Sequence, residues 1–437
     1  MITRSETPLD PSATQTERGQ VPLQVGMQSV SGTGEVPARR AKTKVCMVAY
    51  TFYERDNRVR RYAEALARRG DLVDVVALRN QGQSEIETIN GVRLHRIQRR
   101  IISEKTQLSY LAKMLLFFLR SAIFLTRAQL SERYDVIHVH SLPDFEVFAA
   151  FFPKLTGSKV ILDIHDIVPE FYSSKFNVPK NSLTFKLLVL VERLSIAFAD
   201  HVIAANHIWE ERLQERSVKR NKCSTFLNYP DTQILRRRGR IRKDNRFIIV
   251  YPGSLNFHQG VDIAIRALSL IKNEVPEAEF HIVGVGDQTT FLKSLIEELG
   301  LQGRVFLKGP VPFEEIASVI EDADMGVVPK RNSNFGNEAF STKILEFMAL
   351  GVPVIVPNTE IDRYYFNDSV VQFFCAEDER SLADAMRRLI MNPELRQKLV
   401  KNADEFVGKF TWDAHKTNYF NLVDTLVNSS GGSELRE

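Results

Sequence analysis

Short apolar runs alternate with stretches of helical periodicity through the first half of the chain. The runs 44–50 and 72–78 are mostly apolar, and apolar positions recur between them at helical spacing before Gly70. Continuous apolar runs of this length are typical of parallel strands that are buried on both faces. The alternation continues through three further runs, at 136–140, 160–165 and 201–205. It predicts a doubly wound α/β domain.

The same alternation restarts after a basic, polar stretch at 236–246, which we interpret as a linker between domains. A run at 247–251 is followed by an amphipathic pattern at 261–271. Further apolar runs lie at 280–283, 305–307, 325–328, 354–356 and 370–374. The chain is therefore expected to be an α/β protein with two doubly wound, Rossmann-like domains in series.

The pattern also predicts where these domains begin and end. Residues 1–42 are polar and lack an apolar core stretch, which indicates a disordered tail. The first domain should span 43–235 and the second 247–410. A helix at 411–428 and a second disordered tail at 429–437 complete the chain.

The most informative segment is 337–357, where two glutamates stand eight positions apart. Glu338 belongs to a predicted loop, and Ser341 or Thr342 should cap the helix that carries Glu346, since hydroxyls accept the free amides of a first turn. Free amides at a helix start also attract phosphate. Carboxylates on either side of that phosphate would accept hydrogen bonds from sugar hydroxyls, which predicts a nucleotide-sugar site. Alternatively, Glu338 is a solvated loop residue and Glu346 an exposed helix carboxylate.

The spacing Glu-x7-Glu, followed by Met-Ala-x-Gly-x-Pro-Val, resembles the donor-site signature of retaining glycosyltransferases of family 4, which have the GT-B fold. The resemblance implies that the two domains face each other across a cleft and that the helix 411–428 crosses back onto the first domain. It implies that Glu338 contacts the donor sugar and Glu346 the ribose. It also implies a nucleotide-diphosphate sugar, a UDP- or GDP-sugar, as donor substrate, with no cofactor and no metal.

A second motif, Asp-x-His-Asp-x-x-Pro-Glu at 163–170, resembles the signature that this family carries in its first domain. His165 and Asp166 follow a predicted strand, and ligands in open α/β sheets bind beyond the carboxyl ends of strands. The resemblance places His165 against the donor sugar, so the catalytic candidates are His165, Glu338 and Asp166. Asp166 and Glu170 are candidates to hold the acceptor or shape the loop. Alternatively, His165 caps a carbonyl at the strand end.

The segment 251–262 resembles the diphosphate-binding loop of the family but lacks its two basic residues. Gly253 and Gly260 match, whereas Ser254 and Gln259 stand where an arginine and a lysine are usual. Because the leaving diphosphate needs stabilising donors, other cations should compensate. Our hypothesis is that they are Lys330, Arg331 and Lys343.

Two polar residues after the first strand are further candidates. Asp56 and Arg58 follow the position where many family members carry a Gly-Gly turn that this chain lacks. Either they bind acceptor or phosphate, or Asp56 or Asn57 caps a helix while Arg58 lies at the surface. The Gly-Val-Gly turn at 284–286 resembles one that lies beside the nucleotide base.

Composition narrows the class of protein further. The 437 residues carry a net charge of +4, which is too mild for a dedicated nucleic-acid binder. The three cysteines, Cys46, Cys223 and Cys375, are far apart and indicate reduced core thiols in a cytosolic protein. No cluster of side chains has metal-ligand spacing.

One segment predicts a membrane partner. Residues 108–130 are mostly apolar, but Lys113, Arg120 and Arg127 interrupt them, so we expect no transmembrane helix. Between 93 and 130 there are eight Lys or Arg residues and one acid. A basic, apolar helix suits the surface of an anionic membrane. Alternatively, it packs on the sheet with a solvated basic edge.

These observations predict a cytoplasmic hexosyltransferase-type enzyme, peripheral on the inner face of the plasma membrane. It would move a sugar from a nucleotide diphosphate to a hydroxyl of a lipid-linked or polysaccharide glycan, with retention, in bacterial surface polysaccharide synthesis. The family resemblance attributes retention to a front-face mechanism, in which the departing phosphate helps to deprotonate the acceptor. The alternatives are a weak or inactive nucleotide-sugar-binding subunit of a synthesis complex and a sugar-nucleotide epimerase. A dinucleotide-dependent oxidoreductase is disfavoured because no Gly-x-Gly-x-x-Gly follows the first strand.

Overall fold

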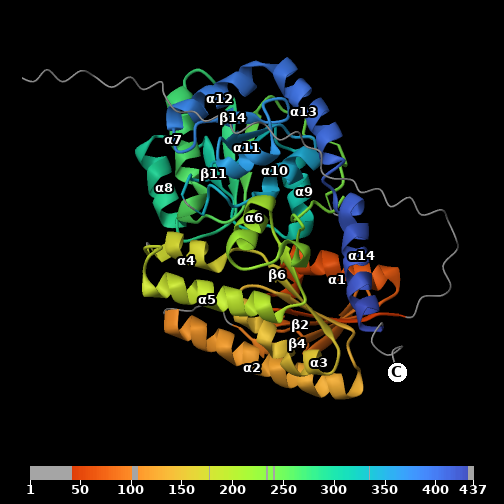
Figure 1. The fold of residues 1–437 in the computed structure, drawn as a ribbon. Helices are drawn as coiled ribbons and strands as arrows, with labels where there is room; N and C mark the ends of the chain where they lie inside the picture. Colours follow the sequence, from red (N-terminus) through yellow and green to blue (C-terminus); the bar gives the residue numbers. More distant parts are fainter. Residues whose placement is uncertain are drawn as a thin grey trace, which may run out of the picture. The chain divides into compact units, whose positions relative to one another are not determined.

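The computed structural model describes residues 42–100, 107–176, 178–232, 235–239, 242–333 and 335–431. Within these residues the chain forms two parallel α/β domains, as the alternating pattern predicts (Figure 1). The predicted tail at 1–42 lies outside the described residues, except for Lys42.

The first domain contains an eight-stranded sheet in the order β3-β4-β2-β1-β5-β6-β7-β8. All neighbouring strands are parallel except β3 and β4. The strands are β1 (Lys44–Ala49), β2 (Leu72–Arg79), β3 (Ile86–Ile89), β4 (Val92–Arg99), β5 (Val136–His140), β6 (Lys159–Ile164), β7 (His201–Ala204) and β8 (Cys223–Thr225).

The strands β3, β4 and β8 are not predicted by the hydrophobic pattern. Strands β3 and β4 form a hairpin whose turn is Asn90-Gly91, both with positive φ (50° and 82°). Asn-Gly is the preferred pair for such a turn. Strand β4 alternates buried with more exposed positions, and its buried positions include Arg96 and Gln98, so it lacks the continuous apolar run that marks the central strands.

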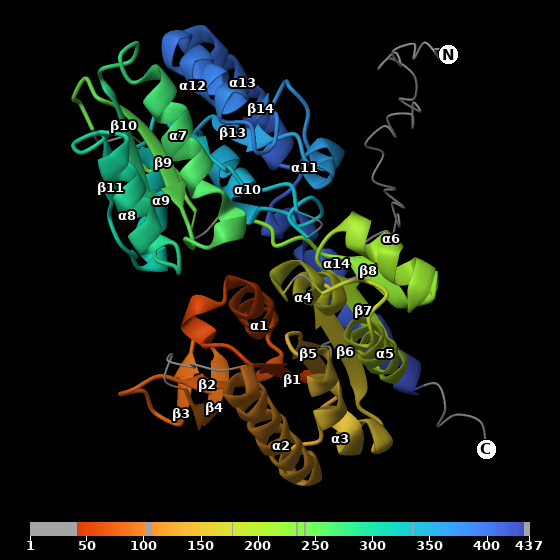
Figure 2. The ribbon, with the colours of Figure 1, turned by 90° about the vertical axis from the view of Figure 1, so that its left-hand side faces the viewer.

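Helices cover both faces of this sheet. Alternate residues of β1 point to opposite faces, so Met47 packs with Val59 of α1, whereas Val48 packs with Phe117 of α2. Figure 2 shows α1 and α2 on opposite sides of the strands. The helical elements are η1 (Tyr53–Arg55), α1 (Asn57–Arg69), α2 (Gln107–Ser131), η2 (Asp144–Ala150), α3 (Phe151–Leu155), α4 (Val168–Phe176), α5 (Leu183–Phe198), α6 (His207–Arg216) and η3 (Arg220–Lys222).

The second domain contains a six-stranded, wholly parallel sheet in the order β11-β10-β9-β12-β13-β14. Its strands are β9 (Phe247–Pro252), β10 (Ala278–Val283), β11 (Val305–Leu307), β12 (Met325–Val327), β13 (Val354–Pro357) and β14 (Gln372–Phe374). Its helices are η4 (Phe257–Gln259), α7 (Val261–Ile271), α8 (Thr289–Glu298), α9 (Phe313–Glu321), α10 (Thr342–Ala349), α11 (Glu360–Tyr365), α12 (Glu379–Met391) and α13 (Pro393–Val407).

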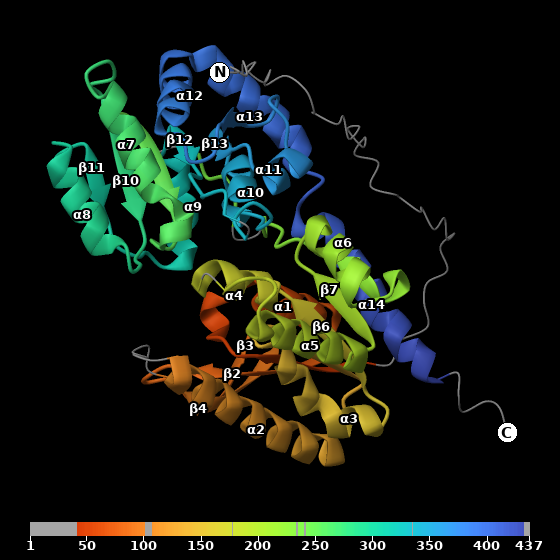
Figure 3. The same ribbon diagram turned by 60° about the vertical axis from the view of Figure 1, so that its left-hand side comes forward.

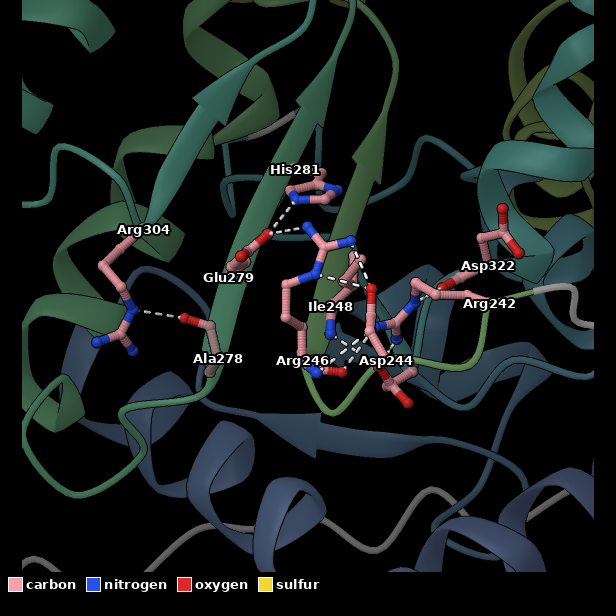
Figure 4. A network of polar contacts seen from close by, with 10 residues as sticks. Arg242, Asp244, Arg246, Ile248, Ala278, Glu279, His281, Arg304 and Asp322 are labelled. Carbon is pink, nitrogen blue, oxygen red and sulfur yellow. Dashed lines mark hydrogen bonds and ion pairs between the residues drawn. The ribbon is translucent and has the colours of Figure 1, made fainter.

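The basic segment between the domains is anchored to the second domain by its arginines. Arg237 donates to the carbonyl oxygens of Met348 and Ala349, both at 2.9 Å, where α10 ends. A cation at this end of a helix is favourable because the last carbonyls lack backbone partners. Figure 4 shows the next part of the segment, where Asp244 accepts from Arg242 and Arg246.

The last helix, α14 (Trp412–Gly431), packs on the first domain rather than the second. Its Tyr419 is fully buried, and its hydroxyl lies 2.9 Å from Nδ1 of His138 on β5. The helix continues to Gly431, so the expectation of a disordered tail is wrong for 429–431. Ser429 bonds to the carbonyl of Leu426 and so satisfies its hydroxyl inside the helix.

By length and composition alone, Ser109–Ser131 of α2 would suit a membrane span. Its inner side nevertheless packs on the sheet through Phe117 and Leu125, both fully buried. The cysteine prediction is correct for Cys46 and Cys223, which are buried and free, and wrong for Cys375, which is free but exposed.

Candidate active site

Loops that follow β9, β10 and β12 pack against one another at the carboxyl edge of the second sheet. A Cβ atom at Gly284 would lie 1.8 Å from the carbonyl oxygen of Gly253, and one at Gly260 would lie 2.1 Å from that of Pro329. Gly260 also has a left-handed φ of 66°. Only glycine permits these approaches, so Gly284 and the predicted Gly260 let these loops pack into the floor of the site, with the carbonyl of the predicted Gly253 against Gly284.

Helix α10 begins beside this floor. Ser341 occupies the N-cap position, but its side chain makes no capping hydrogen bond. Thr342 is the first residue of the helix rather than its cap, and its hydroxyl donates to Oε1 of Glu346 at 3.4 Å. The predicted cap is therefore wrong, and the first turn of α10 has no side-chain acceptor of its own for its free amides.

Lys343 points from the first turn of α10 toward the loop after β9. Its Nζ lies 3.4 Å from Oε1 of Gln259 and 5.5 Å from the ring centre of Tyr251. The hydroxyl of Tyr251 donates toward Gln259 and the carbonyl of Ser254, each at 2.9 Å. Burial lowers the pKa of Lys343, and Glu346 opposes that shift.

Lys330 and Arg331, two of the three cations that the sequence offers for the diphosphate, are both engaged within the protein. Lys330 is buried, donates to the carbonyl of Ala339 at 2.7 Å and pairs with Asp362 at 3.0 Å. Arg331 pairs with Asp262 at 2.6 Å and stacks on Phe257. Of the three candidate cations, Lys343 has the weakest internal partner.

Glu346 is largely enclosed, and burial raises its pKa despite the opposing charge of Lys343. It lines a small cavity with Asn57 and Arg60 of α1 and Asp231 of the segment before the linker. The alternative in which Glu346 is an exposed surface carboxylate is therefore wrong.

Glu338 is held by the first domain. Arg212 of α6 pairs with its Oε1, and the side chain of Asn206 donates to its backbone carbonyl at 3.1 Å. Its other carboxylate oxygen, Oε2, is buried without a partner. Burial raises the pKa of Glu338, while Arg212 opposes that rise. Glu338 is thus no solvated loop residue.

Glu170 is also bound to arginines of α6. Arg216 contacts both of its carboxylate oxygens, at 2.5 and 3.0 Å, and Arg212 reaches Oε1 at 3.5 Å. Arg212 therefore lies between Glu170 and Glu338, two predicted residues from different domains. Glu170 is buried, and both of its carboxylate oxygens accept hydrogen bonds from these arginines.

His165 belongs to a polar cluster at the end of β6. Its Nε2 lies 3.1 Å from Nδ1 of His140 and 3.4 Å from Oδ2 of Asp163. One of these two imidazole nitrogens carries the proton, because two unprotonated nitrogens could not hydrogen-bond to each other, and Asp163 can only accept. His165 is held by side chains, which removes the alternative of a simple carbonyl cap. Burial lowers the pKa of His140 strongly.

Arg58 is the basic residue of this cluster and pairs with Asp163. Its Nε and Nη2 bond to the two oxygens of Asp163 at 2.8 and 2.6 Å, and its Nη1 donates to the carbonyl of Phe226. Burial alone would raise the pKa of Asp163, but Arg58 holds it well below its usual range. Arg58 is neither at the surface nor available to a ligand, and Asp56 caps α1 by accepting from the amides of Arg58 and Val59.

The prediction that no side chains have metal-ligand spacing is wrong at one place in the first domain. Nitrogen atoms of His138 and His140 and an oxygen of Asp163 all lie within 4.8 Å of one another. Residues two apart in β5 point to the same face, which the sequence analysis overlooked. The bidentate guanidinium of Arg58 already supplies the positive charge that Asp163 requires.

Asp166 is half-buried, and burial raises its pKa while His165 opposes the rise. A cavity of about 1050 Å³ is lined by α4 and the segment after it in the first domain and by loops of the second. Its walls include the aromatic rings of Phe171 and Phe257, the cation of Lys175 and the imidazole of His258. Of the predicted site residues, Arg331 alone is part of this lining.

Sequence reasoning missed the residues that orient the predicted ones, namely Arg212, Arg216 and His140. Arg212 and Arg216 stand four apart on one face of α6, a spacing that signals a shared partner. Their partners lie elsewhere in the chain, so the signal identifies the face but not the glutamates.

The two sheets, with a site at their carboxyl edges, define the GT-B class of glycosyltransferases. Sucrose-phosphate synthase from Thermosynechococcus elongatus superposes with a TM-score of 0.73 at 18% identity, covering 89% of this chain and all of that one (100%). Anabaena HepE in complex with UDP-glucose has a TM-score of 0.63 at 16% identity, covering 89% of this chain and 98% of that one.

Family models identify both domains. Residues 56–228 match the glycosyl transferase 4-like domain, and residues 233–406 match glycosyl transferases group 1. The chain therefore belongs to the group 1 glycosyltransferases, as the two motifs suggested.

Individual relatives are distant. An uncharacterized glycosyltransferase of Methanocaldococcus jannaschii is 26% identical over 386 residues, which are 80% of this chain and 89% of that protein. Alpha-D-kanosaminyltransferase of Streptomyces kanamyceticus is 25% identical over 283 residues, 61% of this chain and 71% of that protein. A glycosyltransferase of Escherichia coli assigned to colanic acid biosynthesis is 26% identical over 157 residues, 36% and 39% of the two chains.

Proposed function

We propose that the protein is a retaining, metal-independent glycosyltransferase. It transfers a hexose-type sugar from a UDP- or GDP-sugar to a hydroxyl of a lipid-linked or polysaccharide glycan in bacterial surface polysaccharide synthesis. The relative assigned to colanic acid biosynthesis and the UDP-glucose complex of a structural neighbour support this choice.

The observation that carries the proposal is the first turn of α10. Its amides have no side-chain cap, Lys343 projects from it toward the floor of the site, and Glu346 lies one turn further on. Uncapped amides and a lysine bind the diphosphate, and Glu346 accepts hydrogen bonds from the ribose hydroxyls. Ser341, Thr342, Gly253, Ser254 and Gln259 complete the donor site.

The reacting sugar lies between the two domains. Oε2 of Glu338 has no internal partner, so it is free to accept a hydrogen bond from a sugar hydroxyl. His165 contacts the sugar from the other side, with Asp166 beside it, and its orientation is set by Asp163. The acceptor hydroxyl attacks from the face that the diphosphate leaves, so the departing phosphate oxygen takes the proton and the anomeric configuration is kept.

The acceptor occupies the large cavity beside α4. Its aromatic walls suit the apolar faces of sugar rings, and Lys175 adds a positive charge that suits an acidic or phosphate-bearing acceptor. A cytoplasmic protein peripheral to the membrane through residues 108–130 would meet such an acceptor at the membrane surface.

The loss of two basic residues, at Ser254 and Gln259, favours one second candidate. The protein would then bind a nucleotide sugar as a subunit of a synthesis complex and transfer it weakly or not at all. A sugar-nucleotide epimerase, which would release free nucleotide without an acceptor, is the remaining alternative from the sequence.

A thermal-shift screen against UDP-, GDP-, ADP- and dTDP-sugars identifies the donor, because a ligand that binds the native state raises the melting temperature. We expect one nucleotide class to stabilise the protein and the shift to disappear in Glu346→Ala. Transfer with that donor, analysed by NMR of the product anomer, then tests retention. Binding without transfer to any glycan acceptor would favour the subunit, and no stabilisation by any nucleotide sugar would refute both.

A further inference from the structure

Helices α2 and α5 each expose a regular stripe of apolar side chains. The eight residues of the two stripes are 45–72% exposed, and within each helix they recur every three or four positions. This spacing places them on one side of each helix. The stripes are Leu111, Leu115, Leu119 and Ile123 on α2, and Leu183, Leu187, Leu190 and Leu194 on α5.

The two stripes face the same way. Phe117 of α2 and Ile196 of α5 are buried in one core with Val48 and Val160 of the sheet, so both helices cover the same sheet face. Both also contact η2, and Figure 3 shows them on the same flank of the domain with α3. Helix α3 adds Phe151 and Leu155, which are 58% and 70% exposed. We call the exposed residues of α2, α3 and α5 the α2–α5 face.

The charges on α2 and α5 have one sign at the surface. Helix α2 carries Lys113, Arg120 and Arg127 and no acid, and α5 carries Lys186 and Arg193. The one acid of α5, Glu192, is buried and bonded to Arg216 and Ser217. A protein partner that covers this face would have to be both apolar and acidic. An anionic bilayer has both properties, because its acyl chains are apolar and its headgroups are negatively charged.

A groove beside α2 adds a site for a headgroup. Its volume is about 510 Å³, and three arginines line it together with apolar side chains. Arginine binds phosphate through paired donors, and the apolar wall suits the start of an acyl chain. The lining includes Arg93, Arg120 and Arg127 with Ile97, Ile123 and Phe124, and it also includes the acid Glu132. Arg93 is paired with Asp74 at 2.6 Å, so Arg120 and Arg127 are the cations that the groove offers to a headgroup.

The packing of α2 decides between lying on a membrane and crossing it. The side chain of Gln98 donates to the carbonyl of Lys113 at 3.0 Å, and Arg120 donates to the carbonyl of Ile97 at 3.2 Å. Together with the buried Phe117, these contacts fix α2 to the face of the sheet. The helix is therefore presented to a bilayer sideways, with its exposed apolar stripe facing outward.

We infer that the α2–α5 face docks on an anionic lipid bilayer and that the groove beside α2 receives the phosphate of one lipid headgroup. The inference goes beyond membrane contact through residues 108–130 because it adds α5, α3 and a headgroup site. It does not depend on sugar transfer, since none of these residues belongs to the proposed donor site.

Flotation of the full chain with two kinds of vesicle tests the inference. We expect binding to vesicles of phosphatidylcholine and phosphatidylglycerol in equal parts, much weaker binding to phosphatidylcholine alone, and release at high salt. Leu187→Gln with Leu190→Gln on α5 should weaken binding roughly tenfold, as should Leu115→Gln with Leu119→Gln on α2.

A charge variant tests the groove. Arg120→Gln with Arg127→Gln should remove most of the preference for phosphatidylglycerol while leaving the residual binding to neutral vesicles unchanged. Matched controls on the second domain are Leu270→Gln with Phe291→Gln, whose side chains are equally exposed, and Lys398→Gln with Lys401→Gln. Neither control should change vesicle binding.

Three vesicle-binding results would overturn the inference. They are equal binding to both kinds of vesicle, no binding to either, and normal binding by the α5 variant. Sedimentation of a dimer that the α5 variant abolishes would also overturn it, because a second copy would then cover the face. The thermal shift with a nucleotide sugar should be the same in all variants, so failure here leaves the proposed function standing.

Discussion

The Nζ atom of Lys343 lies 3.4 Å from Oε1 of Gln259, so α10 places a cation at the position where the loop after β9 has lost one. A lysine in the first turn of a helix is unfavourable for the helix dipole. A bound diphosphate would reverse that disadvantage. The same relationship explains Gly253, since a Cβ atom there would lie 2.4 Å from Cε of Lys343.

Removing this cation should weaken the donor complex. We expect Lys343→Met, which keeps the apolar stem, to lower nucleotide-sugar affinity about tenfold or more, because a charge-assisted hydrogen bond to phosphate contributes roughly 1.5–3 kcal/mol. Isothermal titration with the stabilising donor measures the change. Gln259→Lys in the Lys343→Met background should restore part of the affinity by returning the cation to the loop.

Arg331→Gln is the matched control for this prediction, since Arg331 already pairs with Asp262. Its donor affinity should stay within a factor of about two of the wild type. Unchanged affinity in Lys343→Met, or no recovery with Gln259→Lys, would show that the diphosphate is bound elsewhere.

The pH dependence of turnover should depend on Arg212. Burial raises the pKa of Glu338, and Arg212 opposes that rise, so Arg212→Gln should raise the pKa further. The ionised carboxylate is then lost earlier as pH falls, and the acidic limb of the kcat profile moves to higher pH. Arg212→Lys keeps the charge and should move the limb much less. Identical limbs in all three proteins would exclude Glu338 as the titrating group.

Local patterns were enough to predict the helix start and the glycine turns around the proposed donor site. The helix start at 341–342, the glycines at 253 and 260 and the carboxylate Glu346 all follow from short-range spacing, because strand, loop and helix N-terminus are consecutive in the chain. The fold class was predictable for the same reason. The outer strands of the first sheet were harder to predict, since β3, β4 and β8 lack the continuous apolar run of buried strands.

The partners of these residues could not be predicted in the same way. Arg58 and Asp163 are 105 positions apart, and Arg212 and Glu338 are 126 apart. Nothing local in the sequence selects one arginine of many for a distant carboxylate. Even adjacent residues have partners that their sequence position does not predict. Lys330 pairs with Asp362, whereas its neighbour Arg331 points in a different direction and pairs with Asp262.

Breaking the buried pair of Arg58 and Asp163 should destabilise the first domain. Arg58→Met leaves a buried carboxylate without its cation, which costs about 3–5 kcal/mol in comparable cases. Arg58→Met with Asp163→Asn should recover much of this loss because no unpaired charge remains. Denaturant unfolding of the wild type, both single variants and the double variant gives the coupling energy. Additive effects would show that the two side chains do not stabilise each other.

Glu146 should make the protein less stable as pH rises. Both of its carboxylate oxygens are buried without a partner on η2, and burial raises its pKa to about 8, with Ser121 offsetting the shift only in part. The folded protein therefore keeps the proton between pH 4.5, the ordinary value, and about 8, whereas the unfolded chain releases it. The contribution of Glu146 to the free energy of unfolding should therefore be highest below pH 4.5. It should fall by a few kcal/mol as the pH rises from 4.5 to about 8.

Glu146→Gln should flatten that decline and raise the free energy of unfolding at pH 8, measured by urea unfolding at several pH values. Part of the slope should persist, because burial also raises the pKa of Asp144 to about 7. Glu297→Gln, on the exposed side of α8, is the matched control and should leave the profile unchanged. If Glu146→Gln and Glu297→Gln gave the same profile, Glu146 would have to be ionised and solvated in the native state.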